Sequence, residues 1–152
     1  MAIERSSSAH WEGDLKSGNG RFELGSGAFS GPYTYTTRFE SGDNGTNPED
    51  LVAAAHASCF AMAFSNMLAQ EGYTPDSVDV TATVTLDGGK ITRSHLVCEG
   101  RVPGIDDATF QDIGAKAKDG CPISQALKGN VALSVDASLA GWDAVVVSPT
   151  PR

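Results

Sequence analysis

The sequence TNPEDLVAAAHASCFAMAFSNMLAQEG, residues 46–72, decides the fold of this 152-residue chain. Asn47 can cap a helix, Pro48 suits the first helical position, and the two acidic residues that follow are favoured near the positive end of the helix dipole. Gly72 can adopt the left-handed conformation that commonly ends a helix. The pattern predicts a helix of about 24 residues, which is about 36 Å long.

This predicted helix is unusually apolar, because residues 51–68 carry no charged side chain. Its length would allow a transmembrane segment, but polar side chains such as His56 and Asn66 interrupt its surface, so we expect a core helix. A helix that is apolar on nearly every side has to be buried on nearly every side. A chain of this size would struggle to wrap it alone, and a partner subunit is therefore expected.

The composition limits the classes of function. The chain has 11 Lys and Arg against 19 Asp and Glu, a net charge of -8, which disfavours binding to nucleic acid and to anionic membrane surfaces. Its N-terminal residues lack the apolar core of a signal peptide, so we expect a cytoplasmic protein. The length predicts a single domain, which we assign to residues 1–140, with residues 141–152 as a C-terminal extension.

Strand patterns flank the central helix and predict an α+β fold. Residues 77–87 alternate strictly between apolar and polar side chains, as in a half-buried strand, and Gly88 and Gly89 turn the chain into a second strand. The other predicted elements are strands at 21–24 and 33–39 in an N-terminal β-meander, a second-hairpin strand at 91–102, a helix from Asp106 or Asp107 to Gly120, a short helical turn after Cys121-Pro122, and a last strand at 131–139.

Three cysteines are too few and too widely spaced for a secreted disulfide framework. Cys98 shares the apolar face of a predicted strand with Leu96, which favours simple core packing. Cys121 precedes Pro122 at a helix start, where backbone N–H groups stabilise a thiolate, although a cysteine there can also be a simple cap. Cys59 lies in the middle of the long helix, where packing and chemistry are equally consistent with its position.

His56 lies three residues before Cys59 and therefore on the same face of the helix. The spacing permits a Cys-His dyad, or a zinc site formed with Cys121, but no C-x-x-C motif and no second nearby histidine support a metal. No oxyanion-hole signature supports a hydrolase. We interpret His56 as a hydrogen-bonded core residue and expect neither a metal nor a bound cofactor.

Several spaced blocks of this sequence together form a recognisable pattern. They are His10–Gly13, Thr37–Phe39, Thr46–Leu51, Ser58–Phe60, Val102–Asp106 and Cys121–Ser124. In order and kind they resemble the OsmC/Ohr family of bacterial hydroperoxide reductases, over a span from about residue 10 to residue 139. The blocks are more similar to the osmotically inducible protein C branch than to the organic hydroperoxide resistance branch.

The resemblance implies an intertwined α+β homodimer, with two curved antiparallel sheets around two long central helices. It implies that Cys59 is the peroxidatic cysteine, that Cys121 is the resolving cysteine, and that Arg38 and Glu49 form the polar pair that activates the first thiol. It further implies an organic hydroperoxide substrate, an external dithiol reductant of the lipoyl or thioredoxin type, and a role in oxidative or osmotic stress defence. Cys98 has no role in the family pattern, and the tail after residue 139 is longer than expected.

Elementary chemistry is consistent with these roles. Only a thiolate attacks a peroxide, and burial would raise the pKa of Cys59, so a fixed cation such as Arg38 is needed. Glu49 can hold the guanidinium of Arg38, and the resulting sulfenic acid on Cys59 can condense with Cys121 to a disulfide. Ten residues of helix between Glu49 and Cys59 correspond to about 15 Å of rise, so we expect the Arg38 and Glu49 of one subunit to serve Cys59 of the other.

Three alternative functions stay open from the sequence. One is a hydrolase or acyl transferase that uses Cys59 with His56. The others are a thiol redox sensor and a carrier of apolar ligands, neither of which turns over a substrate. For a peroxidase, the apolar residues Phe60, Met62 and Ala63 predict a preference for organic hydroperoxides over hydrogen peroxide.

Overall fold

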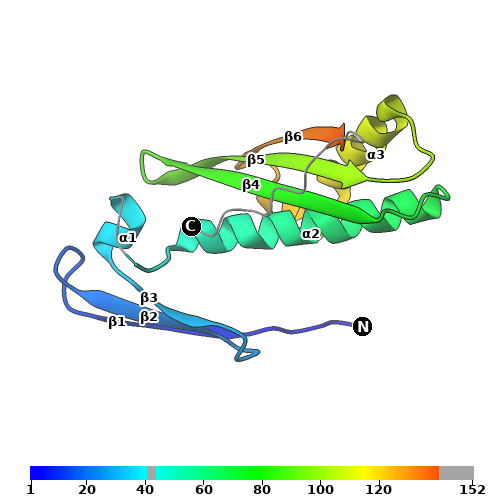
Figure 1. Ribbon diagram of the computed structural model, residues 1–152. Helices are drawn as coiled ribbons and strands as arrows, with labels where there is room; N and C mark the ends of the chain where they lie inside the picture. The colour runs from blue at the N-terminus through cyan, green and yellow to red at the C-terminus, as the bar shows by residue number, and fades with distance from the viewer. Residues whose placement is uncertain (41–43, 141–152) are drawn as a thin grey trace. The chain divides into compact units, whose positions relative to one another are not determined.

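The predicted long helix forms as α2 (Pro48–Gln70) in the computed structural model, which describes residues 1–40 and 44–140 (Figure 1). At its start, Asn47 Oδ1 accepts a hydrogen bond of 2.7 Å from the backbone N–H of Asp50. At its end, Gly72 has a φ of 91°, and the backbone N–H of Tyr73 donates to the carbonyl of Leu68 at 2.9 Å. This is the Schellman arrangement, so both predicted helix ends are confirmed.

The chain divides into two compact units after Val52, and each is described separately. In the first unit the strands pair antiparallel in the order β1-β2-β3, which confirms the predicted β-meander. The predicted domain, residues 1–140, stays a prediction, and the predicted extension at residues 141–152 lies outside the described residues. The elements of the first unit before α2 are β1 (Ser7–Glu12), β2 (Asn19–Leu24), β3 (Ser30–Tyr33) and α1 (Tyr35–Phe39).

The prediction of a strand at residues 33–39 is wrong, because only Tyr33 belongs to a strand and the following residues form helix α1. Alternating aromatic and β-branched residues favour a strand, but Thr34 and Thr37 form a reciprocal cap that closes a helical turn. The Thr37 backbone N–H donates to Thr34 Oγ1 at 3.2 Å, and the Thr34 N–H donates to Thr37 Oγ1 at 2.8 Å. The turn places Arg38 in the last turn of α1.

In the second unit, a three-stranded sheet has the order β4-β5-β6 (Figure 1). β4 and β5 form the predicted antiparallel hairpin, but β6 runs parallel to β5, whereas the resemblance implied antiparallel sheets. The connection from β5 to β6 passes through α3 and α4, and such a helical crossover returns the chain in the parallel direction. The elements are β4 (Ser77–Asp87), β5 (Lys90–Arg101), α3 (Asp107–Gly120), α4 (Pro122–Leu127) and β6 (Ala132–Leu139), which confirms the predicted positions of all five.

One face of α2 forms the core of this unit with the sheet and α3. Phe60, Phe64 and Leu68 are fully buried, and the ring of Phe64 lies 4.8 Å from that of Phe110 of α3. Gly100 of β5 makes room for this aromatic cluster, because a Cβ there would lie 2.5 Å from the Phe110 ring. This packing holds the middle of α2 against β5 and the helices that follow it.

The rest of α2 is less buried than the sequence predicted, since Met62 is 76% exposed. Among the described residues, α2 is the one helix with the length and hydropathy of a membrane span. Its buried face nevertheless packs against a sheet and a helix of its own chain, as in the core helix of a soluble protein. Among the described residues, the exposed side of α2 therefore carries one large apolar side chain, Met62.

Candidate active site

Cys121 lies at the junction between α3 and α4, and the sequence explains why. Pro122 disfavours a helical conformation for the residue before it, so α3 ends and Cys121 takes an extended conformation with φ of −67° and ψ of 142°. Its backbone N–H caps α3 by donating to the carbonyl of Ala117 at 3.0 Å. Its sulfur caps α4 by accepting a hydrogen bond of 3.3 Å from the backbone N–H of Ser124. The Cys-Pro pair thereby places a buried thiol at a defined point.

The sulfur of Cys59 lies within hydrogen-bonding reach of Cys121, and both thiols are reduced. Burial raises the pKa of the Cys59 thiol, the backbone N–H of Ile123 opposes this rise by donating to the sulfur, and the neighbouring Cys121 adds to it. Cys59 is partly exposed, whereas Cys121 is fully buried. The structure therefore brings together the two cysteines that the sequence analysis singled out, with the outer one open to a small molecule.

His56 is fully buried on α2, as predicted, and both of its ring nitrogens have serine partners. Nδ1 lies 2.6 Å from Ser94 Oγ of β5, and Nε2 lies 2.8 Å from Ser124 Oγ of α4. Burial lowers the pKa of His56, so that the imidazole is neutral at pH 7. Since neither nitrogen is left for Cys59, this geometry gives no support to the Cys59-His56 dyad.

Arg38 and Glu49 form a bidentate ion pair within the first unit. Arg38 Nη2 lies 2.8 Å from Glu49 Oε1, and Arg38 Nε lies 3.2 Å from both carboxylate oxygens. The Asn47 side chain donates to the carbonyl of Thr37 at 3.1 Å, which ties the start of α2 to α1. Glu49 is largely buried, and the ion pair fixes the guanidinium in one orientation. The sequence-based pairing of these two residues is seen directly, while their role stays a prediction.

Cys98 lies in the core on β5, as the sequence analysis expected. It is fully buried, and burial together with the charges of Asp79 and Glu99 raises its pKa to about 12. Such a thiol is protonated at neutral pH and unreactive. In the part of the chain that the structure describes, no three His, Cys, Asp or Glu side chains are grouped to hold a metal ion.

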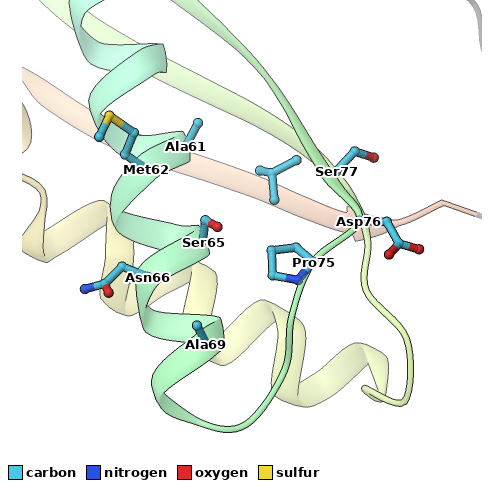
Figure 2. A pocket seen from close by; sticks show the side chains of 9 residues that line it. Ala61, Met62, Ser65, Asn66, Ala69, Pro75, Asp76 and Ser77 are labelled. Carbon is cyan, nitrogen blue, oxygen red and sulfur yellow. The ribbon is translucent and has the colours of Figure 1, made fainter.

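A cavity of about 530 Å³ lies between α2 and the segment that enters β4 (Figure 2). The side chain of Met62 lines it on α2, and Pro75 and Val78 line it on the opposite side. The expected apolar surface around Cys59 needs one correction, because Phe60 is fully buried and packs against Phe64. The exposed apolar surface of α2 near Cys59 is instead formed by residues such as Met62.

No role was predicted from the sequence for Ser94 or for Ser124, although Ser124 belongs to the Cys121–Ser124 block. Ser94 has the same parity in its strand as Leu96 and Cys98, so the alternation already placed a hydroxyl on the apolar face. A buried hydroxyl requires a hydrogen-bond partner, and that requirement was the available signal. Ser124 lies three residues after Cys121, at the position that an N-cap side chain contacts.

This α+β chain holds two free thiols close together, one on a core helix and one at the start of a second helix. A family model described as "OsmC-like protein" matches residues 41–136 of this chain. The chain belongs to this family.

Individual relatives agree with that assignment. The chain is 51% identical to the Escherichia coli protein named peroxiredoxin OsmC, over 88% of this chain and 96% of that protein. It is 39% identical to an organic hydroperoxide resistance protein of Xanthomonas axonopodis, over 60% of this chain and 66% of that protein.

Solved structures show the same fold. An organic hydroperoxide resistance protein from Elizabethkingia anophelis superposes with a TM-score of 0.72 at 25% identity, over 92% of this chain and all of that one. The protein OhrB of Bacillus subtilis superposes with a TM-score of 0.67, also at 25% identity, over 88% of this chain and 98% of that one.

Proposed function

We propose that this protein is a thiol-dependent peroxidase that reduces organic hydroperoxides to alcohols, and hydrogen peroxide less well. The observation that carries the proposal is the contact between the thiols of Cys59 and Cys121. The names of the relatives support it, since they are a peroxiredoxin and organic hydroperoxide resistance proteins. A cytoplasmic enzyme of oxidative or osmotic stress defence, without a bound cofactor, fits these observations.

In the first step, the Cys59 thiolate attacks the peroxide and cleaves its O–O bond. The sulfur gains one oxygen as sulfenic acid, and the other oxygen leaves and is protonated as the alcohol. Because burial raises the pKa of Cys59, the thiolate needs a stabilising cation. Arg38, held by Glu49, is the cation that we assign to this role.

In the second step, the Cys121 sulfur attacks Cys59, the S–O bond breaks and water leaves. The reduced thiols are already in contact, so this step needs little movement of the chain. An external dithiol, of the lipoyl or thioredoxin type, then reduces the disulfide and is itself oxidised. Forming the disulfide promptly also protects Cys59 from irreversible oxidation.

We further propose that the site is shared between the subunits of a homodimer. Glu49 and Cys59 are ten residues apart on α2, which is about 15 Å of helical rise, too far for both to serve one small site within a chain. The large apolar side chain of Met62 on α2, which is 76% exposed, supports a partner subunit. Arg38 and Glu49 of one subunit would then stabilise the Cys59 thiolate of the other.

Steady-state peroxide consumption with a dithiol tests the proposed activity. Cys59→Ser should abolish turnover, since a serine hydroxyl is not readily ionised. If the variant keeps more than about a tenth of the wild-type kcat/KM, the role of Cys59 is contradicted. Such a result would mean that less than about 1.4 kcal/mol of transition-state stabilisation is lost. Running a bulky organic hydroperoxide beside hydrogen peroxide tests the substrate preference, and equal kcat/KM values would argue against it. Absence of turnover in the wild type would favour a redox sensor or a carrier instead.

Mixed dimers test the shared site. Cys59→Ser and Arg38→Met subunits should each be inactive alone, the second because the Cys59 thiolate loses its cation. Mixing them should restore activity, because one site of each heterodimer keeps an intact Cys59 and an intact Arg38 from different chains. Heterodimers that form, by native mass spectrometry, and stay inactive would place each site within one chain.

A further inference from the structure

A continuous chain of buried hydrogen bonds connects Cys121 with His56. The Cys121 thiol donates to Ser124 Oγ at 3.0 Å, and Ser124 Oγ lies 2.8 Å from His56 Nε2. On the other side of the ring, Nδ1 lies 2.6 Å from Ser94 Oγ. Ser94, Ser124 and His56 are all essentially inaccessible to solvent. The three side chains come from β5, α4 and α2, so the fold brings this hydrogen-bonded series together next to one thiol.

The donors and acceptors that each group can supply decide which atom donates in each of these hydrogen bonds. Since the Cys121 thiol donates to Ser124 Oγ, the single hydroxyl proton of Ser124 is free to point at His56 Nε2. His56 Nε2 then accepts, and Nδ1 carries the ring proton and donates to Ser94 Oγ. The tautomer therefore presents a basic nitrogen toward the serine that contacts Cys121. In the other tautomer Nε2 would donate to Ser124 Oγ, and the Ser124 hydroxyl would have to turn its proton away from the ring.

We propose that Ser124 and His56 form a proton relay that deprotonates Cys121 for its attack on the sulfenic acid of Cys59. This inference rests on the proposed function. Ser124 touches the reacting sulfur, and His56 acts through Ser124. The relay serves the second step of the reaction, because Ser124 contacts Cys121, the thiol that must lose its proton in that step.

The step balances in protons and electrons. The thiol proton of Cys121 passes to Ser124 Oγ as the Ser124 proton passes to His56 Nε2, which leaves a thiolate and an imidazolium. The thiolate supplies the electron pair of the new S–S bond, and the S–O bond electrons leave with hydroxide. That hydroxide and the proton held on His56 together make the water that is released. The backbone N–H of Ser124, 3.3 Å from the Cys121 sulfur, remains as a donor to the thiolate.

The environment of His56 agrees with this role. Burial lowers its pKa, so the ring is neutral and able to accept a proton at pH 7. A charged imidazolium would be costly in a buried site, so the proton is held only during the step. The contrasting role for these residues is packing alone, in which the two serines merely satisfy a buried ring. In that case the loss of either serine should have the same consequence.

A chromogenic disulfide separates the relay from both packing and peroxide chemistry. Dithiobis-nitrobenzoate converts Cys59 to a mixed disulfide with thionitrobenzoate, and attack by Cys121 then releases that coloured thiolate in a first-order step. Thionitrobenzoate leaves without needing a proton, so the rate of release reports the deprotonation and attack of Cys121. The labelling rate of Cys59 reports the outer thiol separately.

Ser124→Ala should slow the release about a hundredfold or more, since about a hundredfold is the lower end of the usual contribution of a general base, with an unchanged labelling rate of Cys59. His56→Gln should slow it to a similar degree, because glutamine can replace the hydrogen bonds but not the basic nitrogen. Ser124→Thr, which keeps the hydroxyl, should release thionitrobenzoate at close to the wild-type rate. Circular dichroism identifies any variant that does not fold, and the remaining two still decide the question.

Ser94→Ala is the matched control, because it removes an equally buried serine from the other nitrogen of the same ring. It should slow the release less than about threefold, well short of a general-base contribution. Equal slowing by Ser94→Ala and Ser124→Ala, or a wild-type rate in His56→Gln, would overturn the relay. A wild-type protein that releases thionitrobenzoate rapidly but consumes no peroxide would instead overturn the proposed peroxidase function and leave the relay intact.

Discussion

Two fully buried thiols in the second unit, Cys98 on β5 and Cys121 at the start of α4, have opposite surroundings. Cys98 lies in the apolar core, where burial and the charges of Asp79 and Glu99 raise its pKa to about 12. Cys121 exchanges hydrogen bonds with the side chain and the backbone of Ser124 and contacts Cys59. Equal burial therefore leaves the two thiols in different chemical surroundings. The proposed mechanism makes Cys121 the reactive one, because Ser124 can accept its proton and stabilise its anion.

The largest expected effect concerns Cys121. Cys121→Ser should allow a single turnover and then stop, because the sulfenic acid on Cys59 has lost the thiol that resolves it. Intact-mass analysis after one equivalent of peroxide should show added oxygen in this variant and a loss of two hydrogens in the wild type. A wild-type disulfide that contains Cys98 would reverse the comparison between the two buried thiols.

The next largest effect is expected in the rates at which Cys59 and Cys98 are alkylated. A pKa of about 12 leaves about one Cys98 thiol in ten thousand ionised at pH 8, and its burial further restricts access. We expect iodoacetamide to label Cys59 at least about a hundredfold faster than Cys98 in the folded protein. Peptide mass spectrometry of timed samples measures both rates, and the unfolded chain serves as the control in which the difference should vanish.

The buried imidazole of His56 contacts Ser124, the partner of Cys121, and its burial predicts a pH-dependent stability. The unfolded chain protonates His56 near pH 6.5, whereas burial lowers the pKa of the folded state, so stability is lost as the pH falls below about 6.5. The loss should not exceed about 1.4 kcal/mol per pH unit for this one group. Urea unfolding from pH 7.5 down to 5 measures it.

His56→Gln should show a shallower decline in stability over that pH range than the wild type, since glutamine does not titrate. His10→Gln is the matched control, because it makes the same substitution at an exposed position on β1. Parallel curves for the wild type and His56→Gln would show that the buried ring does not contribute to the pH dependence.

The smallest effect is expected at Cys98 itself. Cys98→Ala should change the kcat/KM for an organic hydroperoxide by less than about twofold, because this side chain only fills space in the core. It should lower the free energy of unfolding by about 1 kcal/mol, as a small core truncation does. Loss of activity with unchanged stability would mean that Cys98 takes part in the chemistry after all.

Much of this fold could be predicted from local sequence. Asn47, Pro48 and Gly72 mark the ends of α2, and the strict alternation of residues 77–87 marks β4, because caps and periodicity depend only on near neighbours. The same local logic failed at α1. The residues after Tyr33 resemble a strand in composition, and only the reciprocal bonds between Thr34 and Thr37 decide for a helix.

By itself, the sequence determined the long apolar helix, the Cys-Pro junction and the family, since each depends on residues close together in the chain. Only the tertiary structure decided which side chains meet His56. Its partners Ser94 and Ser124 lie 38 and 68 residues away, on a strand and on a separate helix. Contacts over such separations follow from how a buried polar ring finds partners in a packed core, and no local pattern encodes them.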